Sequence, residues 1–214
     1  MISNSFYNSD CLRRRCAGAL RRTTSRTLSA VRVITNSGKF GHIINDLNTH
    51  SSNLEFTISG LDLRPAQIKV LVNNVENNAS LKALSMSRKN LTDVEGKEIC
   101  EKLEKNQTLE RLEMEGTLRC YLGNRLGPVT LQSLARLLRL NDTIRFVDLE
   151  RNNILEDPTS GQKDYKAIDE LVDALMVNET VLYINLNNTG LNAKCSKKLR
   201  DIFQTNKTLT LLDL

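Results

Sequence analysis

The stretch NASLKALSM at residues 78–86 decides the fold, because its nine-residue pattern returns four more times along the chain. It reappears as NQTLERLEM at 106–114, NDTIRFVDL at 141–149, NETVLYINL at 178–186 and NKTLTLLDL at 206–214. Each copy reads Asn-x-Ser/Thr, an apolar residue, two variable residues, and two apolar residues separated by one. The asparagines lie 28, 35, 37 and 28 residues apart. This period indicates a solenoid, in which each repeat is one supersecondary unit stacked on its neighbours.

Within each repeat, the apolar spacing changes from that of a strand to that of a helix. In the first copy, Leu84 and Met86 alternate with polar residues, which is the period of a short strand with one buried face. Ile99 and Leu103 lie four residues apart and so share one helix face. We expect Asn106 to end that helix in a left-handed conformation. The predicted order is strand, loop and helix, and the helix supplies the crossover that parallel strands need.

The other repeats keep this register. Their expected core residues are Leu109, Leu112, Met114, Leu126, Leu134 and Leu138, then Ile144, Val147, Leu149, Ile154, Leu171 and Leu175, and finally Val181, Ile184, Leu186, Leu191, Leu199 and Phe203. Residues 56–78 fit the same frame one period earlier, and Ile43 and Leu47 predict one more helix upstream.

Two of the steps are long because extra residues lie within Glu115–Asn124 and within Ile154–Leu171. Both insertions are expected between a strand and the following helix, so both should protrude from the same rim. Insertions of this kind often serve function. Length drift in a permissive loop is the alternative, because long loops cost little extra entropy.

These repeats resemble leucine-rich repeats of the ribonuclease-inhibitor type, and the resemblance covers roughly residues 51–214. The 28-residue step and the Leu-x-x-Leu-x-Leu core followed by a full helix are that class's pattern. It is similar to the repeat regions of NOD-like receptors, of Ran GTPase-activating protein and of tropomodulin-like actin regulators. The resemblance implies an α/β fold: a horseshoe solenoid with a parallel β-sheet on the concave face and helices on the convex face.

The sequence departs from that family at one position of the repeat. The family's consensus asparagine, which bonds backbone groups between neighbouring coils, is matched only at Asn124 and Asn152. Leu61, Lys89 and Thr189 stand there in the other repeats. We therefore expect an incomplete asparagine ladder and local irregularity.

The net charge of +5 originates near the N-terminus. Residues 1–50 hold eight Lys/Arg and two acids, whereas the remainder holds 22 basic and 23 acidic residues. We therefore do not expect the repeats to bind nucleic acid. We divide the chain into 1–38, a basic Ser/Arg-rich arm or degenerate cap, and 39–214, a leucine-rich-repeat domain of about five repeats that ends inside a repeat.

The basic arm admits several interpretations. It is a disordered tail, a cap with a strand near 27–34, a mitochondrial transit peptide, or a nuclear-import or phosphate-binding patch. Transit peptides share its Arg-rich, Ser-rich and acid-poor composition, and no acid occurs between Asp10 and Asp46. The sequence leaves these alternatives open.

Cysteine, histidine and sequon patterns favour a reduced compartment and no cofactor. The five cysteines form neither a disulfide framework nor a CxxC pair, and two histidines make a metal site unexpected. We expect a cytoplasmic location, with mitochondrial import through the arm as the alternative. Five of the seven Asn-x-Ser/Thr sequons coincide with the repeat junction, so the repeat explains their spacing better than glycosylation does. No segment approaches the ~20 apolar residues of a membrane span.

The candidate binding surface consists of strand residues that alternate with the core and so face the concave side. Its members are Arg111, Glu113, Glu115, Phe146, Asp148, Glu150, Tyr183 and Asn185. Together they form a partly acidic patch with two aromatic anchors, suited to a basic or amphipathic protein segment. The alternative is a solvated face whose acids are neutralised by Arg111, Arg145 and Arg151.

The leading functional hypothesis is a non-catalytic scaffold or adaptor that binds a protein partner on this face. No Gly-rich phosphate loop, Ser/His/Asp arrangement or paired-His motif occurs in the sequence. One alternative is a GTPase-activating protein of the Ran type, with Arg119 or Arg125 as the loop arginine. Another is an organelle- or RNA-associated protein that uses the basic arm. The last strand, within 208–214, is expected to pair at its edge with another chain or to continue into a C-terminal extension.

Overall fold

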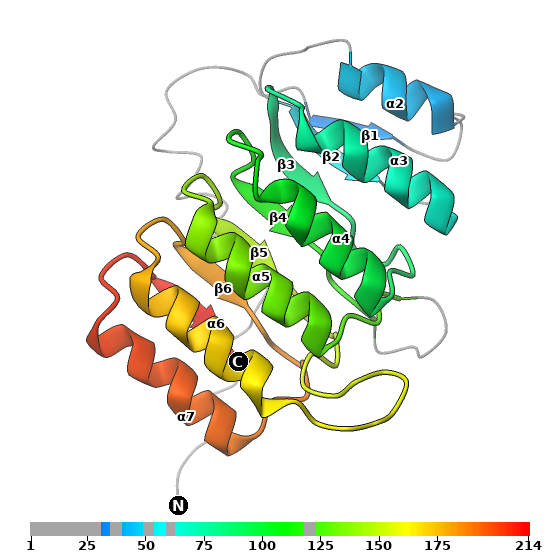
Figure 1. Ribbon diagram of the computed structural model, residues 1–214. Coiled ribbons are helices and arrows are strands. Elements are labelled where there is room, and N and C mark those ends of the chain that lie inside the picture. Colours follow the sequence, from blue (N-terminus) through cyan, green and yellow to red (C-terminus); the bar gives the residue numbers. More distant parts are fainter. Residues whose placement is uncertain (1–30, 35–39, 49–53, 59–62, 118–122) are drawn as a thin grey trace, which may run out of the picture.

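The computed structural model describes residues 31–34, 40–48, 54–58, 63–117 and 123–214. Along these residues, strands and helices alternate, and seven strands form one parallel sheet in which each strand pairs with the next. Figure 1 shows the helices side by side in one layer that covers one face of the sheet. The predicted solenoid with a parallel sheet on one face and helices on the other is confirmed.

The elements follow the predicted frame. The strands are β1 (Val31–Ile34), β2 (Leu54–Ile58), β3 (Leu81–Ser85), β4 (Arg111–Glu113), β5 (Phe146–Asp148), β6 (Tyr183–Asn185) and β7 (Leu211–Asp213). The helices are α2 (Phe40–Asn48), α3 (Pro65–Glu76), α4 (Asp93–Leu103), α5 (Pro128–Leu140), α6 (Tyr165–Val177) and α7 (Ala193–Asp201), followed by the 3₁₀ helix η1 (Ile202–Gln204). The upstream helix predicted from Ile43 and Leu47 is α2. β1 lies inside the 1–38 segment, and residues 1–30 lie outside the described part of the chain.

The strand register matches the predicted columns. Glu113 lies between Ser85 of β3 and Asp148 of β5, and Asn185 and Asp213 continue the same row. Because the register repeats from strand to strand, residues from 28 to 37 positions apart become lateral neighbours on one face.

Among the predicted core residues whose burial the structure describes, two in the last repeat are not fully buried. Phe203 was predicted to be a core residue, but its side chain is 41% exposed, whereas the preceding Ile202 is fully buried. The prediction was wrong because α7 gives way to η1, which has three residues per turn in place of 3.6. The tighter winding turns Ile202 inward and Phe203 outward. Leu191 is only partly buried against the core.

The junction asparagines do not take the left-handed conformation that we expected. Asn141 and Asn178 have φ values of −104° and −76° with ψ near 130°, which is extended backbone. Among the described residues, the non-glycine positions with positive φ are instead Arg88, Asn90, Arg151 and Asn188, beyond the strand ends. The rule that a left-handed residue ends a helix therefore failed at this junction, and the asparagine is needed for its side chain.

That side chain links three pieces of backbone. The Asn106 amide nitrogen donates to the carbonyl oxygens of Val75 (2.9 Å) and Asn78 (3.1 Å) in the preceding coil. Its oxygen accepts from the backbone N–H groups of Thr108 (3.0 Å) and Leu109 (2.8 Å), which open the next strand. Only a primary amide offers two donors and an acceptor in so short a side chain. Equivalent links occur at Asn78, Asn141, Asn178 and Asn206.

A second asparagine position operates at the opposite rim, beyond the strand ends. Asn124 accepts from the backbone N–H groups of Lys89 and Leu91 and donates to the carbonyl of Met86 at 2.9 Å. Asn152 donates to the carbonyl of Met114 at 2.9 Å, and so links two coils as well. At the equivalent Thr189, the hydroxyl donates only to Leu186 of its own coil. This rim is held by side chains in some coils and not in others.

Both insertions lie between a strand and the following helix. The first runs from β4 to α5, with 118–122 outside the described residues. The second runs from β5 to α6 and is closed by Asp157, whose carboxylate accepts from the backbone N–H groups of Thr159 and Ser160. These bonds lower the pKa of Asp157 below its usual range, with the backbone N–H of Ser160 as the largest cause. The loop is therefore an ordered turn that depends on an ionised carboxylate.

The N-terminus of α5 is capped by a carboxylate from the preceding repeat. The buried carboxylate of Asp93, at the start of α4, accepts from the backbone N–H groups of Gly127 (2.8 Å) and Thr130 (2.7 Å) at the start of α5. Gly127 is required there, because a Cβ would lie 2.8 Å from the Asp93 carboxylate. Asp164 and Asn192 cap α6 and α7 directly.

No helix in the described residues is long and apolar enough to cross a bilayer.

Candidate functional site

The concave face carries a stack of three side chains from three adjacent strands. The Arg111 guanidinium lies 4.1 Å from the centre of the Phe146 ring. The Phe146 and Tyr183 rings are stacked, with centroids 4.2 Å apart and an interplanar angle of 23°. The parallel register places these three residues opposite one another on β4, β5 and β6, and strands lie about 4.8 Å apart. The stack is thus imposed by the repeat spacing.

Three members of the predicted surface are too buried to serve as exposed contacts. Tyr183 is 6% exposed, Glu150 is 3% exposed, and Asn185 is fully buried. Phe146 stacks on the Tyr183 ring, and the Asn185 amide donates to the carboxylates of Asp148 (3.2 Å) and Glu150 (3.1 Å). Tyr183 and Asn185 therefore support the concave face from beneath, and partner binding by the predicted surface stays a prediction.

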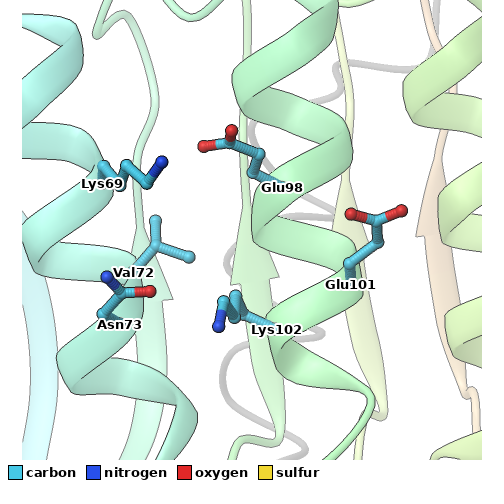
Figure 2. A pocket seen from close by; sticks show the side chains of 6 residues that line it. All are labelled: Lys69, Val72, Asn73, Glu98, Glu101 and Lys102. Atoms are coloured by element: carbon cyan, nitrogen blue, oxygen red, sulfur yellow. The ribbon is translucent and has the colours of Figure 1, made fainter.

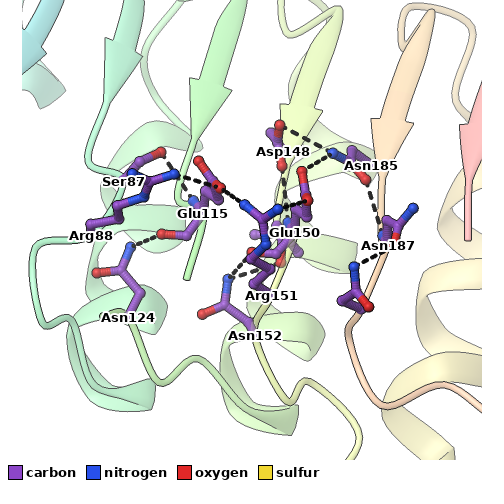
Figure 3. Close-up of polar contacts among 12 residues, drawn as sticks. Ser87, Arg88, Glu115, Asn124, Asp148, Glu150, Arg151, Asn152, Asn185 and Asn187 are labelled. Atoms are coloured by element: carbon purple, nitrogen blue, oxygen red, sulfur yellow. Dashed lines mark hydrogen bonds and ion pairs between the residues drawn. The ribbon is translucent and has the colours of Figure 1, made fainter. Parts of the chain in front are cut away.

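Two of the predicted acids are neutralised by arginines at the strand ends (Figure 3). Glu115 contacts Arg88 at 3.1 Å and Arg151 at 2.5 Å, from the coils before and after its own. Glu150, only 3% exposed, pairs with Arg151 at 3.2 Å. For these two carboxylates, the predicted alternative of internal neutralisation describes the geometry better than an open acidic patch.

Arginine pairing was only partly anticipated from the sequence. Arg111 pairs with Glu113 at 3.3 Å and Arg151 with two acids, as expected. Arg145 is exposed and forms no ion pair with a described residue. Arg88 was missed, although it occupies the same place in its repeat as Arg151, two residues after the last apolar strand position. That shared place was the signal that could have identified it.

Four half-buried side chains remain at the surface of β4 and β5. These are Arg111, Glu113, Phe146 and Asp148, which we call the concave patch. Asp148 accepts from the Glu150 backbone N–H at 2.9 Å and from Asn185, so its carboxylate is held in position. The patch presents one aromatic ring between a guanidinium and two carboxylates on a rigid sheet.

On the helix-covered convex side, a groove lies between α3 and α4 (Figure 2). Its volume is about 430 Å³, and it is lined by Lys69, Val72, Asn73, Glu98, Glu101 and Lys102. Lys102 is held by Glu76 at 2.8 Å. Lysine and glutamate side chains line the groove together, which favours a gap between helices over a ligand site.

The residues proposed for other chemistry are dispersed. Arg125 is exposed on the segment between β4 and α5, and Arg119 lies outside the described residues. Burial raises the pKa of the Cys100 thiol well above its usual range, so this cysteine is a poor nucleophile. Cys195 is also buried. In the described part of the chain, no three His, Cys, Asp or Glu side chains cluster as metal ligands.

Comparison with known proteins rests on structure. No protein-family model matches the sequence, and no curated protein matches it. Solved structures do. The fold is that of a leucine-rich-repeat domain.

Two matches support that assignment. The tropomodulin C-terminal domain of Caenorhabditis elegans superposes with a TM-score of 0.60 at 16% identity, over 79% of this chain and 93% of that one. A structure described as Leiomodin-1 Actin-Binding Site 2 superposes with a TM-score of 0.56 at 17% identity, over 78% of this chain and 86% of that one. The predicted leucine-rich-repeat fold is confirmed, and the ribonuclease-inhibitor subtype stays a prediction.

Proposed function

We propose that this protein is a non-catalytic scaffold that binds a protein partner through the concave patch. The observation that carries the proposal is the stack of Arg111 on Phe146 and of Phe146 on Tyr183, which holds an aromatic ring rigid at the sheet surface. Aromatic and arginine side chains dominate interface energetics, and preorganisation lowers the entropy lost on binding.

The chemistry of the patch fits a basic or amphipathic segment. Glu113 and Asp148 flank the Phe146 ring on the strands, so a partner cation can reach a carboxylate while its apolar neighbour packs on the ring. Carboxylates at the rim of such a contact mainly set orientation and on-rate, whereas the ring supplies affinity. We therefore assign Phe146 the largest share of binding energy.

Actin is the first partner to test, because one of the similar structures is named for an actin-binding site. We place the scaffold in the cytoplasm, and mitochondrial import through residues 1–38 stays the alternative. The 28-residue step supports the ribonuclease-inhibitor type of repeat.

The test compares two triple variants of the full chain. The concave variant is Arg111→Ala/Glu113→Ala/Phe146→Ala. The convex control is Val94→Ala/Lys97→Ala/Glu101→Ala, which removes an exposed apolar side chain and an exposed ion pair from α4. We expect the concave variant to lose at least about tenfold in affinity, measured by co-sedimentation with filamentous actin, while the control keeps wild-type affinity.

Two further measurements separate loss of binding from loss of the fold, and actin from other partners. Thermal unfolding of both variants checks that the fold is retained. If wild-type protein does not bind actin, quantitative affinity purification with the same pair replaces co-sedimentation. Partners recovered equally with the concave variant and the control would refute the concave face as the binding surface.

A further inference from the structure

The convex helix layer follows a rule of charge complementarity. α4 carries four acids and two lysines, and α5 carries two arginines and no acid. α6 carries three acids and one lysine, and α7 carries three lysines and one arginine against one acid. From α4 to α7 the net charge thus alternates in sign, whereas α3 carries one lysine and one glutamate, so adjacent helices in this part of the layer attract one another.

The alternation produces ion pairs across the helix layer. These are Arg139–Asp173 at 3.9 Å, Lys198–Asp169, and Arg136 with Glu104, the residue that follows α4, at 3.0 Å. Each joins consecutive repeats. The charge on one helix is therefore a guide to the charge on whatever packs against it.

α7 satisfies this rule on one flank only. Its apolar side faces the core through Cys195 and Leu199, and Lys198 reaches Asp169 on α6. Among the described elements, α7 packs against α6 and η1. At 3.6 residues per turn, Arg200 lies about 200° around the helix from Lys198, on the opposite flank. Lys197 and Arg200 are both exposed there.

An apolar contact point accompanies these cations. Phe203, one turn after Arg200, is turned outward by η1 and is 41% exposed. Figure 1 places α7 at the end of the helix layer. An exposed phenylalanine beside cations that pair with no described residue is an apolar contact point with a charged border.

We propose that the outer flank of α7, formed by Lys197, Arg200 and Phe203, docks an acidic amphipathic helix of a partner protein. The acidic face of that helix would meet the two cations as α6 meets Lys198 on the other flank. Its apolar face would cover Phe203. This site is distinct from the concave patch, so a partner can occupy each independently.

The test uses two designed peptides and the full chain. The probe is an amphipathic helix with Leu on one face and Glu on the other, and its counterpart has Lys in place of every Glu. Binding is followed by fluorescence anisotropy at low and high salt. We expect the Glu peptide to bind with salt-sensitive affinity and the Lys peptide to bind at least about tenfold more weakly.

Matched variants locate the contact. Lys197→Glu/Arg200→Glu should weaken the Glu peptide at least about tenfold and reverse the preference toward the Lys peptide. Phe203→Ala should weaken both peptides to a smaller extent. The control Lys105→Glu/Lys166→Glu reverses two cations that are each 79% exposed elsewhere on the convex side, and should change affinity less than about twofold.

Four outcomes overturn the proposal. They are no binding of the Glu peptide up to about 1 mM, equal binding by the reversed variant, and tighter binding of double-stranded DNA that the same variant abolishes. The fourth is self-association through this flank in sedimentation velocity, which would make the occupant a second copy of the chain.

Discussion

The two rims of this solenoid differ in the side-chain hydrogen bonds that link neighbouring coils. At the rim where helices end and strands begin, a junction asparagine occurs in all five copies of the repeat motif and reaches back to the preceding coil. At the opposite rim, the Asn124 and Asn152 side chains link coils, whereas the Thr189 hydroxyl bonds only within its own coil. Both insertions lie at this second rim. The comparison teaches that one uniform rim is enough to keep the stack in register, which leaves the other rim free to vary.

Removing a junction asparagine should have the largest effect. Asn106→Ala removes one of the donors to the carbonyls of Val75 and Asn78, and it removes the side-chain acceptor of the Thr108 and Leu109 N–H groups. We expect it to lower the free energy of unfolding by about 3–4 kcal/mol, because buried polar groups are left unsatisfied. Urea denaturation measures this loss. Asn106→Asp retains the acceptor and should fall between, and a loss under about 1 kcal/mol for the alanine variant would contradict the uniform-rim interpretation.

The rim that carries Asn124, Asn152 and Thr189, which we call the variable rim, should tolerate substitution better. Asn152→Thr copies the natural residue at Thr189 and gives up the bond to Met114 of the preceding coil. We expect a loss of about 1–2 kcal/mol in urea unfolding. The matched change Asn141→Thr at the uniform rim should lose more, and equal losses would remove the distinction between the rims.

Strand-end arginines give a smaller and more specific effect. Arg88 has φ of 59°, a conformation that costs a non-glycine residue about 1–2 kcal/mol. Its ion pair with Glu115 is largely exposed on the arginine side, so the pair contributes under about 1 kcal/mol. Arg88→Gly should therefore be more stable than Arg88→Ala by about 1 kcal/mol in thermal unfolding. Equal stability of the two variants would contradict the strain assigned to this turn.

The smallest effect is local and depends on pH. The pKa of Asp157 is lowered in the folded chain, so the stabilisation of its loop is present above the ordinary pKa of an aspartate. It is lost as pH falls through the lowered folded value. Amide resonances of Thr159 and Ser160 should shift with a midpoint below the ordinary pKa of an aspartate. Asp157→Asn should abolish that transition, and an unchanged titration in this variant would assign it to another group.

Much of the architecture could be predicted because the same spacing of apolar residues recurs in every repeat. Once the strand positions were aligned, Glu113 and Asp148 had to be neighbours, as did Arg111 and Phe146. Alternation along a strand and four-residue spacing along a helix are local signals, and repetition turned them into a sheet order.

The errors arose where side-chain chemistry between coils decides the outcome. The extended backbone at Asn141 follows from the position of carbonyls 35 residues earlier, which no local helix-ending rule contains. The burial of Tyr183 depends on the ring stacked over it, and the exposure of Phe203 on a switch from α to 3₁₀ winding. In each case the alignment was right and the rotation or partner of the side chain was not available from spacing alone.

The buried amide nitrogen of Asn106 has a consequence for where the chain can be made. Asn106 and its counterparts stand in acceptor tripeptides for N-linked sugars, and attachment would occur on the nitrogen that donates to the preceding coil. A sugar added to the nascent chain would remove that donor and occupy space filled by the next coil. We expect secretory expression to yield a modified, unstacked polypeptide, whereas ribosomes that release the chain into the cytosol let each amide find its carbonyls first.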